Sequence, residues 1–186
     1  MNYSHFIVVT NRKLCKTDYL MQIRKVTALH PHALILREKD LSDQEYMRLA
    51  SSVMEICKEA NVLCYLHSRD QIARDVSCQN LHLSISELRR LGDGVKDFNE
   101  ISVSCHSKED VLEALAAGAS QIVLGTIFET DCKPGLEGRG TSFVSEIAEI
   151  CPVPLYAIGG IHEDNIHLVM EAGATGGCMM SGFMQM

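Results

Sequence analysis

Short apolar segments alternate with longer helical segments along the whole chain, and this alternation limits what it can fold into. The apolar segments, which we expect to form strands, are Phe6–Thr10, Ala33–Arg37, Val62–Leu66, Asn80–Leu83, Ile101–Val103, Gln121–Gly125, Val153–Ile158 and Gly177–Met180. Helices are expected between them, including Ser42–Ala60, Ser107–Ala117, Ser142–Ile150 and His162–Ala172. Strands joined through helices pair in parallel, because a parallel crossover needs about a dozen residues or more.

Eight strand–helix units predict a TIM (β/α)8 barrel, formed as a single domain by residues 1–186. Glycine-bearing turns after the last two strands favour this closed barrel over a doubly wound open sheet, which is the alternative. The eighth strand ends near Met180, so the barrel is expected to lack its final outer helix. Apolar surface between the first and seventh helices would then be uncovered. Such a patch usually binds a partner, so we expect a homodimer.

The composition argues against several classes of protein. A formal net charge of -7 is unfavourable for nucleic-acid binding, which needs a basic surface. The first residues do not form a charged leader followed by a long apolar run, and no apolar stretch approaches a membrane span. We therefore expect a cytoplasmic protein without a membrane partner. The eight cysteines are scattered singly, which predicts free thiols rather than a zinc site or a disulfide framework.

Two glycine-bearing turns follow the last two strands. Gly159 and Gly160 stand between a strand and a helix, and Gly182 follows Met180 and Ser181. Glycines at such turns let backbone N–H groups approach an anion closely, and barrels commonly bind phosphate after strands seven and eight. These turns predict a phosphate site, although a glycine can also serve a tight turn through its dihedral angles alone.

A long loop between Gly125 and Gly140 follows the sixth strand. Loops of this length in compact domains are often functional lids. Thr130 and Lys133 are candidate anion donors there, and Cys132 is a possible nucleophile, for which an inert thiol is the favoured interpretation. The alternative is a solvated loop without function.

Two cations, Arg37 and Lys39, stand at the end of the second strand and would face the same end of the barrel. In the alternative interpretation they merely precede a solvated helix. His30 and His32 precede a strand, at the opposite end of the barrel, so we interpret them as loop residues rather than metal ligands.

Together these motifs resemble the superfamily of thiamin phosphate synthase and the TenI-type thiazole tautomerases. The resemblance covers essentially the whole chain and is strongest from Ile101 to Ser181. The segment FETDCKPGLEGRG, residues 128–140, looks especially like the TenI branch. The resemblance implies a TIM barrel, a role in thiamin biosynthesis and a small phosphorylated thiazole as ligand.

The resemblance also implies roles for individual residues. Lys133, Thr130, His106 and Ser104 are the implied catalytic group; Thr130 and Lys133 match a T-x-x-K motif that binds phosphate, and Ser104 with His106 matches an S-x-H motif. The implied phosphate and substrate ligands are Arg37, Lys39, Thr126, Gly159, Gly160, Met180 and Ser181.

The chain departs from both branches of the superfamily at catalytic positions. Synthases hold magnesium by carboxylates after strands three and four. Here the first of these positions reads His67-Ser68. The second is Glu87, but a role in capping the following helix explains a glutamate there equally well. A family glutamine is replaced by Ile35. We therefore expect no metal, with Glu87 as a ligand only in a synthase. TenI tautomerases carry a histidine where this chain has Thr126.

Three functions remain open at this point. We expect an enzyme that isomerises a thiazole phosphate by proton transfer without a cofactor, with His106, His67 or Glu129 replacing the missing histidine. The first alternative is a magnesium-dependent thiamin phosphate synthase that condenses pyrimidine pyrophosphate with thiazole phosphate. The second is a non-catalytic protein that binds or senses a thiamin-pathway phosphate.

Overall fold

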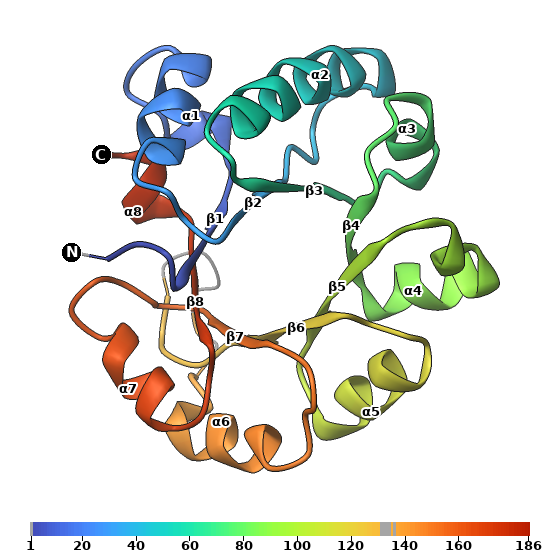
Figure 1. Ribbon diagram of the computed structural model, residues 1–186. Helices are drawn as coiled ribbons and strands as arrows, with labels where there is room; N and C mark the ends of the chain where they lie inside the picture. The colour runs from blue at the N-terminus through green and yellow to red at the C-terminus, as the bar shows by residue number, and fades with distance from the viewer. Residues whose placement is uncertain (1, 131–134, 136) are drawn as a thin grey trace.

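The computed structural model describes residues 2–130, 135 and 137–186, and within them the strands form a closed parallel barrel (Figure 1). The strands are β1 Phe6–Val9, β2 Ala33–Leu36, β3 Leu63–His67, β4 Asn80–Ser84, β5 Glu100–Cys105, β6 Gln121–Gly125, β7 Leu155–Ile158 and β8 Gly176–Met179. Each strand pairs with its sequence neighbours, and β1 pairs with β8 to close the sheet. The predicted TIM barrel is confirmed.

Helices surround the barrel as an outer ring (Figure 1). They are α1 Tyr19–Thr27, α2 Asp43–Glu59, α3 Asp70–Asp75, α4 Ile85–Leu91, α5 Lys108–Ala116, α6 Gly140–Ala148, α7 Ile166–Glu171 and α8 Ser181–Met184, with the 3-10 turns η1 Arg12–Leu14 and η2 Gly92–Asp97. Ser42 and Ser84 open α2 and α4 with complete capping boxes, which satisfy backbone N–H groups that a first turn leaves unpaired. None of the helices in the described ranges has the length and apolar character that a membrane span requires.

Most strands are apolar on both faces because each face packs against a different core, whereas β4 and β5 also bury the polar side chains of His82 and Ser102. In β2, Leu34 and Leu36 pack outward in the cluster shared with the helices, whereas Ala33 and Ile35 belong to a smaller cluster that includes Tyr65. Parallel strands covered on both sides need this continuous apolar character. The barrel interior is therefore filled, and ligands can be held only at its ends.

The last two units differ from the sequence-based expectation in their details. Helix α7 begins at Ile166 rather than at His162, because a side-chain turn precedes it. His162 N donates to Asn165 Oδ1 over 2.8 Å, and Asn165 Nδ2 donates to Gly160 O over 2.8 Å. This turn separates the first turn of α7 from the paired glycines, so the helix begins later than predicted, and the anion site at these glycines stays a prediction.

A four-residue helix, α8, stands in place of a full outer helix and lies beside α1 (Figure 1). Its Phe183 and Met184 are fully buried, and Gln22 Nε2 donates to Phe183 O over 2.6 Å. The expectation of an uncovered groove is therefore wrong in part, since α8 fills some of it. Met21 on α1 and Leu168 on α7 do remain exposed, and a homodimer stays a prediction.

Candidate active site

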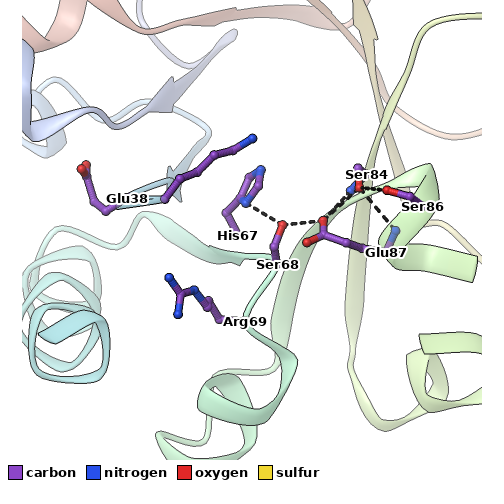
Figure 2. Close-up of a pocket in the computed structure, with 8 residues that line it drawn as sticks. Glu38, His67, Ser68, Arg69, Ser84, Ser86 and Glu87 are labelled. Carbon is purple, nitrogen blue, oxygen red and sulfur yellow. Dashed lines mark hydrogen bonds between the residues drawn. The ribbon is translucent and has the colours of Figure 1, made fainter. Parts of the chain in front are cut away.

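A polar cavity of about 380 Å³ opens at the carboxyl ends of β2, β3 and β4 (Figure 2). Its walls are the residues that follow these three strands: Glu38, Lys39, His67, Ser68, Arg69, Ser84, Ser86 and Glu87. Parallel strands in a closed barrel bring the loops after them to one end, where barrel enzymes carry their active sites. The predicted residues Lys39 and Glu87 thus lie in one cavity, although they are far apart in the sequence.

Glu87 reaches this cavity from the first turn of α4. Its Oε2 accepts hydrogen bonds from Ser84 N at 3.1 Å, from Ser84 Oγ at 3.0 Å and from Ser68 Oγ at 2.5 Å. Burial alone would raise the pKa of Glu87, but the hydrogen bonds from Ser68 and Ser84 outweigh it and lower the pKa from its usual value. Glu87 is therefore an ionised carboxylate whose acceptor oxygen is already engaged, and the predicted capping role is confirmed.

His67 ends β3 and lies beside Glu87 through Ser68. Ser68 Oγ is 2.6 Å from His67 Nδ1, and the ring of His67 packs at 5.5 Å from that of His82. Burial lowers the pKa of His67 to about 4, and the positive charges of Lys39 and Arg37 act in the same direction, against Glu87. Near neutral pH the imidazole is uncharged.

A second buried histidine, His82, links the cavity to the predicted Ser104. His82 Nε2 lies 2.8 Å from Ser104 Oγ, and its Nδ1 lies 2.9 Å from Ser102 Oγ, which also accepts from Gln121 Nε2 at 2.9 Å. Burial holds the pKa of His82 well below its usual value. Sequence reasoning missed His82 because a single histidine inside an apolar strand has no distinguishing pattern.

Of the two basic residues after β2, Arg37 and Lys39, only Lys39 lines the cavity. Between them, Glu38 is buried and accepts from Thr10 Oγ1 at 2.8 Å and from Arg12 N at 3.0 Å. Glu38 therefore holds the loop after β1 against the residues that follow β2. Its place between two basic residues in the sequence does not indicate this role.

Arg69 adds a further cation that the sequence did not single out. Its guanidinium forms an ion pair with Asp43, donates to Leu41 O over 2.8 Å and lies 5.0 Å from the ring centroid of Tyr46. These contacts hold Arg69 at the rim of the cavity. Its charge is partly neutralised there by Asp43.

The paired glycines after β7 lie on the other side of the barrel end, against the loop after β6. Gly159 and Gly160 have φ angles of 100° and 62°, a left-handed conformation that favours glycine. A Cβ on Gly159 would lie 2.4 Å from Thr126 Cγ2, and one on Gly160 would lie 2.4 Å from Glu129 O. Both glycines are thus required by the close packing of the two loops, and a phosphate site at them stays a prediction.

The predicted residues Ser104, His106, Met180 and Ser181 also lie at this end of the barrel. Ser104 lies near the carboxyl end of β5 beside His82, and His106 Nδ1 lies 2.6 Å from Gly125 O. Ser181 opens α8 directly after Met180 and is exposed. Thr130 belongs to the described residues, whereas Lys133 and Cys132 fall outside them.

The cavity does not have the donors of a magnesium site. Magnesium is held in proteins by carboxylate oxygens together with water and substrate phosphates. Ser68 stands at the first expected carboxylate position, and the Oε2 of Glu87 already accepts from three donors. No cluster of three histidine, cysteine or acidic residues is arranged for a metal in the part of the chain that the structure describes. The residues present therefore do not fit the ion.

Comparison with known proteins decides the family. A sequence profile described as thiamine monophosphate synthase matches residues 6–183. The chain belongs to the thiamine monophosphate synthase family. "Putative thiamine-phosphate synthase 2" from Aquifex aeolicus (strain VF5) is 30% identical over an aligned length of 188 residues, covering 100% of both chains. "Thiamine-phosphate synthase" from Fusobacterium nucleatum subsp. nucleatum is 28% identical, covering 95% of this chain and 87% of the relative.

Solved structures support the same family. A thiamine phosphate pyrophosphorylase from Pyrococcus furiosus superposes with a TM-score of 0.84 at 25% identity, covering 97% of this chain and 87% of that chain. The superfamily resemblance expected from the motifs is confirmed, and these relatives carry synthase names. Membership of the TenI branch stays a prediction.

Proposed function

We propose that this protein is a transferase of thiamin phosphate formation, which joins a phosphorylated pyrimidine to a phosphorylated thiazole. The observation that carries the proposal is the family match over residues 6–183, together with relatives named thiamine-phosphate synthase along the whole chain. The match favours this transferase reaction over the isomerisation that the loop motif suggested. The polar cavity at the catalytic end of the barrel is consistent with it.

The two halves of the barrel end suit two anionic substrates. Lys39 in the cavity after β2–β4 would bind the pyrophosphate of the pyrimidine, while Gly159, Gly160 and Ser181 would bind the thiazole phosphate through their backbone N–H groups. Ser104 lies near the carboxyl end of β5, between these halves, where its hydroxyl would contact either substrate. Because the cavity does not fit magnesium, we assign no step to the ion.

The test is incubation of the purified protein with pyrimidine pyrophosphate and thiazole phosphate, with and without magnesium. We expect thiamin phosphate and released pyrophosphate, measured by chromatography and phosphorus NMR. Lys133→Ala should weaken ligand affinity in calorimetry, whereas Lys96→Ala, at an exposed lysine paired with Asp93, is the matched control. Absence of product from substrates that calorimetry shows to bind would count against the transferase.

A second candidate is isomerisation of a thiazole phosphate by proton transfer. It is favoured by Ser68 at a metal-ligand position and by the neutral His67 beside it. Proton NMR of the thiazole phosphate carboxylate tautomer, followed against a buffer blank, tests this reaction. Conversion to the aromatic isomer would assign the isomerase. Broadened ligand lines without conversion, and without transferase product, would leave the non-catalytic binding protein.

A further inference from the structure

A continuous chain of hydrogen bonds joins Glu87, Ser68 and His67 in the wall of the cavity (Figure 2). A serine hydroxyl has one proton to donate, and an ionised carboxylate can only accept. Ser68 Oγ lies 2.5 Å from Glu87 Oε2, so the Ser68 proton points to that oxygen. This leaves the lone pairs of Ser68 Oγ for its other neighbour.

The direction of the Ser68–Glu87 hydrogen bond fixes the direction of the Ser68–His67 hydrogen bond. Since Ser68 has already donated its proton to Glu87, the contact of 2.6 Å with His67 Nδ1 requires that this nitrogen carry the hydrogen. A neutral imidazole has a single N–H, so Nε2 of His67 then carries a lone pair. Among the described residues, no group forms a hydrogen bond with this nitrogen.

We propose that His67 is the proton acceptor of this site. Glu87 and Ser68 fix the imidazole so that the Nε2 lone pair can accept a proton from the ligand. The proposal rests on the isomerisation candidate above. In this chain His67-Ser68 stands where synthases carry the first magnesium-binding carboxylate. In the proposal, His67 at this place supplies a base instead of a metal ligand.

The surroundings of His67 support the assignment. Arg37 and Lys39 act on its charge from the loop after β2 and Glu87 acts from α4, while the ring of His82 on β4 lies beside it. The two cations favour an uncharged imidazole and would attract an anionic substrate, whereas Glu87 stabilises the imidazolium that forms when a proton is taken up. Both nitrogens of His82 are occupied by serine hydroxyls, so of these two neighbouring histidines only His67 has a nitrogen available among the described contacts.

The step balances without a further reagent. The C–H bond of the thiazole tautomer breaks, its proton moves to His67 Nε2, and its electron pair remains in the ring system of the substrate. The imidazolium then returns the proton to a carbon outside the ring, which leaves the ring aromatic. A positioned general base of this kind contributes about 10²–10⁴-fold to the rate.

The first test is the tautomer of His67, read from long-range proton–nitrogen NMR correlations of the whole protein labelled with nitrogen-15. We expect hydrogen on Nδ1 and a bare Nε2 near neutral pH, and loss of this fixed tautomer in Ser68→Ala. Ser51→Ala, at an exposed serine of α2, is the matched control. Hydrogen on Nε2 in the native protein, or a spectrum unchanged by Ser68→Ala, would overturn the proposal.

The second test is exchange of the thiazole proton with deuterium oxide, with ligand affinity measured by calorimetry in the same samples. His67→Gln should lower the exchange rate by about 10²–10⁴-fold and leave affinity within a few-fold, whereas His167→Gln on the outer face of α7 should exchange normally. Full exchange in His67→Gln overturns the proposal. If the native protein exchanges no proton, the isomerisation candidate fails and the assignment of His67 as proton acceptor fails with it, whereas the transferase is still tested by its own product assay.

Discussion

Replacement of Phe183 by alanine tests whether α8 is part of the core despite its four residues. The Phe183 side chain is fully buried, with its ring edge-on to Phe6 at 5.7 Å and 5.9 Å from the ring of Tyr3. Removing a buried phenylalanine costs about 3–5 kcal/mol through lost transfer free energy and an unfilled cavity. In a domain of this size each kcal/mol lowers the Tm by about 2–4 °C, so Phe183→Ala should lower it by about 6–20 °C.

The assay is thermal and urea denaturation followed by circular dichroism, with Met186→Ala as the control. Met186 is exposed, and surface substitutions usually change stability by less than about 0.5 kcal/mol. The unfolding free energy of a domain is only about 5–15 kcal/mol, so the expected loss is a large fraction of it. A loss below about 1 kcal/mol in Phe183→Ala would refute the reasoning and show that α8 is loosely attached.

Three further predictions concern the site. Gly160→Ala should destabilise the protein more than Gly92→Ala in urea denaturation, because both have positive φ but only Gly160 packs against backbone; equal losses would contradict the packing argument. The pKa of His67 is about 4 in the folded protein against a usual 6.5, so the unfolded chain binds the proton first as the pH falls. The unfolding free energy should therefore fall as the pH drops from 6.5 toward 4. In His67→Gln this fall should be less steep. Ser68→Asp should raise the pKa of Glu87 by like-charge repulsion and increase manganese binding, measured by electron paramagnetic resonance; no gain would show that the missing carboxylate is not what prevents metal binding.

The barrel was predictable from the sequence because its evidence is spread over many residues. Each apolar strand segment and each helix cap, such as Ser42 and Ser107, points to the same alternation, so errors at single positions do not change the topology. The boundaries were less predictable, as α7 shows. Its start is set by the side chain of Asn165, a local hydrogen bond that periodicity does not reveal.

The candidate site was predictable only where a motif marked it. Lys39 was identified from its place after the second strand and Glu87 from the family resemblance, and the cavity contains both. The buried partners were not predictable, because Glu38 stands between two basic residues and His82 is a single histidine between two leucines of β4. Their roles arise from neighbours that only the folded barrel brings close, namely Thr10 for Glu38 and Ser104 for His82.

The pairing of β1 with β8 has a consequence for the order in which the protein is made. During synthesis β1 is the first strand to emerge and its partner β8 the last, so the growing chain exposes two unpaired strand edges until β8 has left the ribosome. Unpaired edges of apolar strands are templates for association with other chains. We therefore expect nascent chains that stop before Gly176 to depend on chaperones, and the completed barrel to be released from them once its two ends pair.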